Sequence, residues 1–122
     1  MSVLLYVGSA LTVLWGISHV FPTRNVVAGF GDLTADNRRI ITMEWIVEGV
    51  ALIAVGTFVA ATTAVDSAAR VADAVYGTAI ATLVVLALVS LFTGFRIKFL
   101  PFRLCPVIFT LSAILIALGA WA

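Results

Sequence analysis

The segment Thr34–Ala61, TADNRRIITMEWIVEGVALIAVGTFVAA, decides how the rest of the chain is interpreted. From Ile40 onward it is long and apolar enough to cross a membrane as a helix, for which about 20 mostly apolar residues are needed. Two carboxylates, Glu44 and Glu48, lie inside this run and, four residues apart, share one helix face. Because an unpaired carboxylate in hydrocarbon is strongly unfavourable, we expect groups on neighbouring helices to face them.

The composition indicates that the lipid bilayer is the environment of the whole chain. Of the 122 residues, 63% are hydrophobic and 11% are charged, whereas a soluble domain has about 45–50% apolar and about 25% charged residues. The net charge of +1 gives no reason to expect a nucleic-acid partner. The single cysteine, Cys105, excludes an internal disulfide and a CxxC centre.

The hydrophobic pattern predicts one domain, residues 1–122, with four transmembrane helices at about 2–20, 38–61, 74–95 and 104–121. Pro22 ends the first span, and Thr34 is a suitable N-cap for the second. Short connections favour an all-α, up-down antiparallel bundle. No Lys or Arg precedes the first span and no A-x-A site follows it, which favours a retained span over a cleaved signal peptide.

The cations predict how this bundle is oriented in the cell membrane. Six of the seven fall in or beside the first and third connections: Arg24, Arg38, Arg39, Arg96, Lys98 and Arg103. Only Arg70 falls on the other side. The positive-inside rule therefore predicts a multi-pass protein with both cationic connections in the cytoplasm and with extracytoplasmic N- and C-termini.

Polar residues from several helices are expected to meet at the cation-rich end. His19 ends the first helix, Glu44 and Glu48 enter along the second, Arg96 follows the third, and Cys105 begins the fourth. Ser9, Thr12, Gly16 and His19 form a small and polar stripe at helical spacing on the first helix. Two carboxylates and an imidazole in an apolar setting are the groups that general acid–base catalysis uses.

The leading hypothesis is an enzyme that acts on a lipophilic small molecule as an isomerase, epoxide hydrolase or cyclase. Glu48 is expected to donate the proton, with Glu44 as its partner and His19 as a second acid/base or orienting group. Arg96 and Arg38 are candidates for binding the polar part of the substrate, and Trp15 and Trp45 are further substrate-binding candidates. The alternatives are a proton-coupled small transporter, for which a homo-oligomer is considered, and a non-catalytic subunit of a membrane complex.

Each candidate also has a plainer interpretation. His19 could be an interfacial helix-end histidine, Glu44 an interface residue paired with an arginine, and Cys105 a buried small residue. The two tryptophans could simply be packing or interfacial aromatics. The possible metal ligands are scattered along the chain, so neither a metal nor a cofactor is expected.

Four segments carry a resemblance to known proteins: WGISHVFPTR (Trp15–Arg24), MEWIVEG (Met43–Gly49), FTGFRIK and LCP. They resemble the signature of small uncharacterised bacterial four-helix membrane proteins, and the size and helix plan are similar to the broad DoxX-like group. This resemblance implies a four-helix membrane bundle and no established active site. One His with two Glu also resembles, in residue types only, the membrane sterol isomerases that act by protonation.

Overall fold

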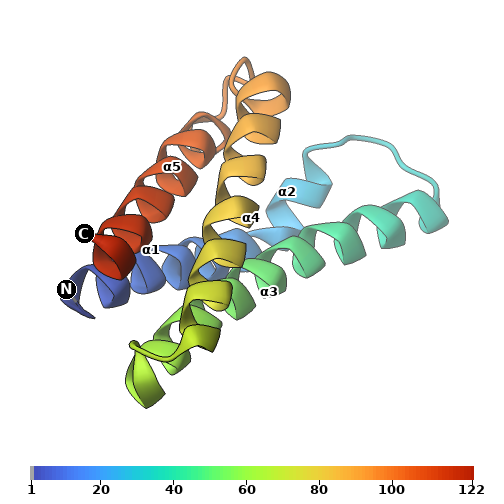
Figure 1. The fold of residues 1–122 in the computed structure, drawn as a ribbon. Helices are drawn as coiled ribbons and strands as arrows, with labels where there is room; N and C mark the ends of the chain where they lie inside the picture. The colour runs from blue at the N-terminus through green and yellow to red at the C-terminus, as the bar shows by residue number, and fades with distance from the viewer. Residues whose placement is uncertain (1) are drawn as a thin grey trace.

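A computed structural model describes residues 2–122 as an all-helical chain (Figure 1). The helices are α1 (Ser2–Val20), α2 (Thr23–Ala28), α3 (Ala35–Asp66), α4 (Arg70–Gly94) and α5 (Leu100–Trp121). Four of them, all but the short α2, are long and apolar enough to cross a membrane. The predictions of an all-α fold and of four candidate spans are confirmed.

The helix boundaries follow local sequence signals. α1 ends at Val20, as Pro22 predicts. Thr34 caps α3, because its side-chain oxygen accepts a hydrogen bond from the Asn37 N–H at 3.1 Å. α5 begins at Leu100, before the predicted start, because Pro101 suits the first helical turn, where its missing N–H has no partner to lose. The first connection, expected to be irregular, contains the short helix α2.

Glycines bring α1 and α3 into close contact. A Cβ atom on Gly16 would lie 2.8 Å from the Gly49 carbonyl oxygen, and one on Gly56 would lie 2.7 Å from a backbone carbonyl of α1. Such close approach stabilises helix pairs in lipid, where apolar surface alone gives no driving force. Gly49 and Gly56 thus permit close packing of α3 on α1. A Cβ atom on Gly77 of α4 would meet only the Trp121 ring, at 4.0 Å, so this glycine makes no close helix contact.

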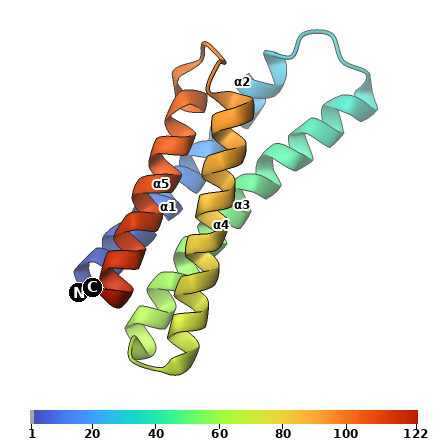
Figure 2. The ribbon, with the colours of Figure 1, turned by 45° about the horizontal axis from the view of Figure 1, so that its top comes forward.

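The remaining packing is uneven along the molecule. α4 packs along α5 and α1 contacts α5, whereas α3 and α4 touch least among the consecutive spans. Figure 2 shows both chain termini at one end, with the connections after α2 and after α4 at the other end. The first half of α3 leans away from α4 and α5 in both ribbon views. The α1–α3 pair and the α4–α5 pair are therefore less tightly joined at the end that carries these connections.

The middle of the bundle is closed by large apolar side chains. Leu52, Leu83 and Phe109, from three different helices, are each at most 1% exposed. One polar contact joins α3 to α4 inside this core, where Thr63 Oγ1 and the Tyr76 hydroxyl lie 2.9 Å apart. Hydrogen bonds of this kind add to helix association in membranes.

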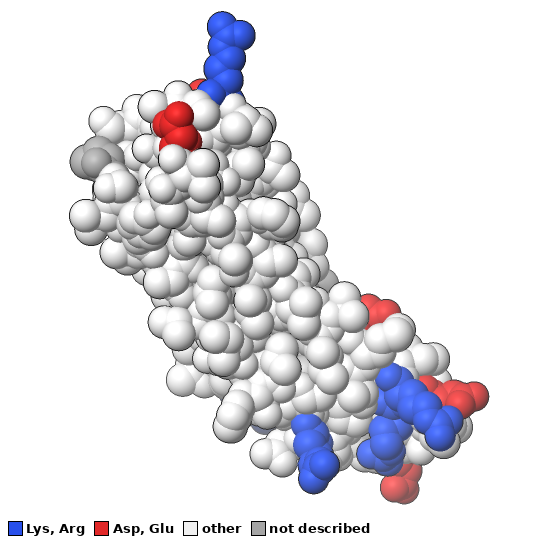
Figure 3. Space-filling view, turned by 90° about the horizontal axis from the view of Figure 1, so that it is seen from below, with Lys and Arg blue, Asp and Glu red and all other residues white. Residues whose placement is uncertain are grey.

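The charged side chains fit a membrane-spanning orientation. Figure 3 shows them gathered at two ends of the molecule, with a broad uncharged band between. An uncharged band flanked by charged ends matches the hydrocarbon core and its two headgroup layers. Which end faces the cytoplasm stays a prediction from the distribution of cations.

Candidate functional site

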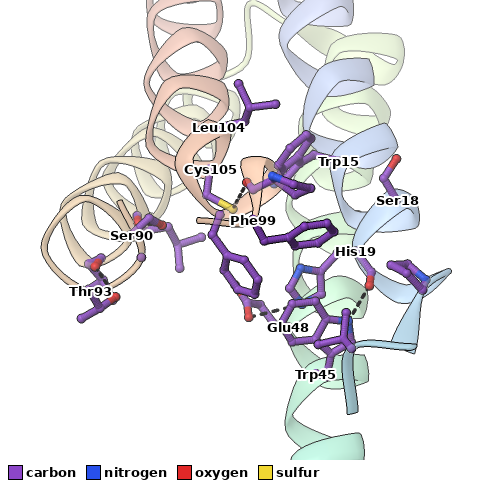
Figure 4. A pocket seen from close by; sticks show the side chains of 17 residues that line it. Trp15, Ser18, His19, Trp45, Glu48, Ser90, Thr93, Phe99, Leu104 and Cys105 are labelled. Carbon is purple, nitrogen blue, oxygen red and sulfur yellow. Dashed lines mark hydrogen bonds and ion pairs between the residues drawn. The ribbon is translucent and has the colours of Figure 1, made fainter. Parts of the chain in front are cut away.

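A pocket of about 390 Å³ lies between α1, α3, α4 and α5 at the cation-rich end (Figure 4). Ligand sites in proteins typically measure about 300–1,000 Å³ and combine apolar walls with a few polar groups. The polar side chains and tryptophans on this pocket's wall are Trp15, Ser18, His19, Trp45, Glu48, Ser90, Thr93 and Cys105. Phe99, Phe102 and several aliphatic residues complete the wall. The pocket thus has the size and lining of a site for a lipophilic molecule.

His19, in the last turn of α1, is held in place by Trp45 of α3. The His19 side chain is 8% exposed. Its ring stacks on the Trp45 indole, with ring centroids 3.9 Å apart and an angle of 16° between the planes. The Trp45 N–H also donates a hydrogen bond to the His19 backbone carbonyl at 2.6 Å. Carbonyls in the last turn of a helix lack intrahelical partners, so this bond both satisfies the helix end and orients the imidazole.

Glu48 is the partner of this imidazole. Its Oε2 lies 3.3 Å from His19 Nε2, and its side chain is 46% exposed. Figure 4 shows both groups on the pocket wall, joined by this contact. This is a contact by distance only, because Nε2 has no hydrogen bond of good geometry, with Glu48 or with any other group, in the part of the chain that is described. The expectation that a neighbouring helix supplies a group facing Glu48 is confirmed, and that group is a base rather than an arginine.

Trp15 and Cys105 lie further along the same wall. The Trp15 indole nitrogen is buried and has no hydrogen-bond partner within residues 2–122. Leaving a buried N–H unpaired costs about 1–3 kcal/mol. The Cys105 thiol is already engaged, since Sγ donates to the Pro101 carbonyl at 3.4 Å. Trp15 therefore presents at the pocket an indole N–H that faces the weak acceptor Cys105 Sγ and has no oxygen acceptor, on the helix that also carries His19.

Three predicted site residues lie elsewhere. Glu44, one turn before Glu48, is exposed on α3 and does not line the pocket; it borders a shallow groove that Trp45 and Glu48 also line. Arg38 is exposed near the start of α3, and Arg96 is exposed after α4. Glu44 forms no ion pair with an arginine in the described chain, where the ion pairs are His19–Glu48 and the exposed pair Asp36–Arg39; its interpretation as an interface residue stays a prediction. The structure brings Trp15, His19, Trp45 and Glu48 together, and leaves Glu44, Arg38 and Arg96 outside the pocket.

Sequence reasoning missed the wall that α4 and α5 provide. Ser90 and Thr93 line the pocket, and each hydroxyl donates to the backbone carbonyl four residues earlier. Phe102 meets the Trp45 ring edge-on, with centroids 5.7 Å apart. The spacing of three between Ser90 and Thr93 is a signal that could have identified this face of α4. Phe99 and Phe102 carried no such signal, because aromatics beside cations are typical of an interface.

Among the described residues, no group of three or more His, Cys, Asp and Glu side chains lies close enough to hold a metal ion. Comparisons with known proteins find no matching family model, no matching curated protein and no matching solved structure. The resemblance to DoxX-like proteins therefore stays a prediction. Inference about function depends on the pocket itself.

Proposed function

We propose that this protein is an integral membrane enzyme that binds a lipophilic small molecule in the pocket and moves a proton on it by acid–base catalysis. The observation that carries the proposal is the 3.3 Å contact between His19 Nε2 and Glu48 Oε2 on the wall of a mostly apolar pocket. An imidazole and a carboxylate at this distance need only a small closing movement to exchange a proton directly, and catalytic contacts of this kind tighten when a substrate binds. The apolar walls suit a substrate that is dissolved in lipid.

Double-bond isomerisation is the simplest reaction of this kind. Protonated Glu48 gives its proton to one alkene carbon, which leaves a cation on the adjacent carbon. His19 Nε2 then removes a proton from the next carbon along, and that C–H electron pair forms the shifted double bond. The proton on His19 returns to Glu48 across their contact. The cycle is balanced without a co-reactant, and epoxide opening and cyclisation can begin with the same proton donation.

Trp45 is the positioning residue in this proposal. It acts through His19, by stacking on the ring and by binding the backbone carbonyl. General bases are effective when their orientation is fixed before the substrate arrives. Trp15 supplies a donor for an oxygen on the substrate, such as a hydroxyl or a carbonyl.

Access from the lipid phase, between α3 and α4, is part of the proposal. Val89 and Thr93 on α4 and Glu48 on α3 all line the pocket and are exposed. These two helices also contact each other least among the sequential spans. An up-down antiparallel order with extracytoplasmic termini would place this opening in the cytoplasmic leaflet.

The other two hypotheses find less support. A carrier needs access from both sides, whereas Leu52, Leu83 and Phe109 fill the core beyond the pocket. A purely structural subunit predicts a carboxylate that is fully satisfied, with no cavity beside it. Glu48 instead borders a cavity of about 390 Å³ and is half exposed.

Deuterium incorporation tests the proposal without a known substrate. The protein in lipid nanodiscs is incubated in D₂O with a lipid extract from membranes of the source organism, and the lipophiles are analysed by mass spectrometry. We expect time-dependent deuterium uptake at carbon in one compound, lost in Glu48→Gln and retained in the matched control Glu44→Gln. Unchanged uptake with Glu48→Gln would contradict the proposal, and so would no uptake above empty nanodiscs with the wild-type protein.

A further inference from the structure

The charges around the pocket are distributed unevenly. Six of the seven cations belong to the end of the molecule at which the pocket lies, yet none of them lines it. Glu48 is the only Asp, Glu, Lys or Arg on the wall. A ligand inside the pocket therefore meets one carboxylate, and no arginine or lysine lines the wall to balance its negative charge.

The aromatic lining adds to this asymmetry. Four aromatic side chains, in addition to His19, form part of the wall: Trp15, Trp45, Phe99 and Phe102. The face of an aromatic ring carries negative charge density and attracts cations, most strongly where water is excluded and most strongly for tryptophan. A carboxylate set among tryptophan and phenylalanine rings is the chemistry that recognises ammonium groups with apolar substituents.

We propose that the pocket selects lipophilic molecules that carry a positive charge, or that acquire one when Glu48 protonates them. This inference deepens the proposed function and rests on the same pocket, because it specifies the charge of the bound species. After proton donation the pocket holds a Glu48 carboxylate, a neutral His19 and a cationic substrate. A lipophilic tertiary or quaternary ammonium compound reproduces that distribution of charge and is a ligand of this site.

The geometry disfavours the opposite charge. A fatty acid or another anionic lipophile would bring its head toward Glu48, and within the wall only His19 could offset the repulsion. Arg38 and Arg96, the sequence-based candidates for binding the polar part of the substrate, are exposed outside the pocket. An anionic ligand would therefore leave its charge unpaired in an apolar site.

A matched pair of probes tests the charge preference. The first is (5-phenylpentyl)trimethylammonium, and the second is its uncharged isostere, in which carbon replaces nitrogen. Binding to the protein in nanodiscs is measured by calorimetry, with empty nanodiscs subtracted. We expect the ammonium to bind the wild-type protein at least tenfold more tightly than the isostere. Glu48→Gln should abolish that difference, while Glu44→Gln, which removes the same charge one turn away, should preserve it.

The outcomes separate this inference from the proposed function. If both probes bind equally well and both are excluded by the pocket-filling variants Ser90→Phe and Thr93→Phe, the lipophile site stands and the charge preference is wrong. If Glu44→Gln lowers the preference as much as Glu48→Gln, general surface charge is responsible and the inference is wrong. If neither probe binds the wild-type protein, both the inference and the pocket's role in lipophile binding are contradicted.

Discussion

Replacing Gly16 with alanine should weaken the fold and the site together, because this glycine lies where α1 and α3 touch. A Cβ atom there would lie 2.8 Å from the Gly49 carbonyl oxygen and 2.9 Å from the Ile53 nitrogen. Both are backbone atoms and cannot rotate away, so the two helices must separate by about 0.7 Å to reach a favourable contact distance of about 3.5 Å. Overpacking of this kind costs about 1–3 kcal/mol of unfolding free energy.

The same separation reaches the site through neighbouring residues. His19 follows Gly16 by one helical turn, and Glu48 directly precedes Gly49. Moving the helices apart therefore lengthens the 3.3 Å contact between His19 and Glu48. Since a misplacement of about 1 Å can cost about 100-fold in rate, a shift of about 0.7 Å should lower deuterium incorporation by about 25-fold.

The assay compares Gly16→Ala with Gly77→Ala, in which the same atom is added to a different helix. At Gly77 the new Cβ would meet only the Trp121 ring, at 4.0 Å, and alanine is favoured over glycine inside a helix by about 0.5–1 kcal/mol. Thermal unfolding in detergent, followed by circular dichroism, should show Gly16→Ala destabilised and Gly77→Ala unchanged or stabilised. Equal stability and equal deuterium incorporation in the two variants would refute the argument that the glycine contact sets the geometry of the site.

Three further substitutions have defined expectations. Trp45→Phe keeps a ring against His19 but loses the 2.6 Å hydrogen bond to its carbonyl, so deuterium incorporation should fall severalfold. Affinity for the ammonium probe should fall less, because phenylalanine keeps a weaker cation–π face; an equal fall in both would argue for a role in ligand binding alone. Tyr76→Phe removes the buried 2.9 Å contact to Thr63 and should lower the free energy of unfolding by about 0.6 kcal/mol, measured by thermal unfolding. Deuterium incorporation should not change, and a loss of incorporation would speak against a closed core between this contact and the pocket. Thr34→Ala removes the N-cap of α3 and should lower the stability of the first turn of this helix by about 1 kcal/mol. Backbone hydrogen exchange in that turn should become faster, and unchanged exchange there would count against the cap.

The four spans, and the side of the pocket that His19 and Glu48 form, could be predicted from the sequence because their signals are local. Span lengths follow from runs of apolar residues, and Pro22 and Thr34 mark helix ends through their own backbone chemistry. The pairing of His19 with Glu48 follows from energetics, since a carboxylate inside an apolar helix needs a partner on a neighbouring helix. Each of these inferences needs only the residue and its immediate surroundings.

The separation of Glu44 from Glu48 could not be predicted in this way. Residues four apart share a helix face, and this rule correctly stacks the two carboxylates. One turn also moves a residue about 5.4 Å along the axis. The first half of α3 leans away from α4 and α5 (Figure 2), so Glu48 still lines the pocket while Glu44 borders only the shallow groove beside it. The lean depends on packing between helices, which the local pattern does not encode.

The pocket exists because two kinds of helix contact meet at one end of the bundle. Glycines draw α1 against α3 closely enough for His19 and Glu48 to meet. α4 and α5 pack on each other and approach α3 only loosely, so their residues Ser90 and Phe102 form a facing wall instead of filling the space. Uniformly close packing would close the cavity, and uniformly loose packing would separate the acid from its base. The reactive pair and the room for a substrate therefore depend on the same unevenness, which is why a single added methyl group at the α1–α3 contact is expected to act on both stability and chemistry.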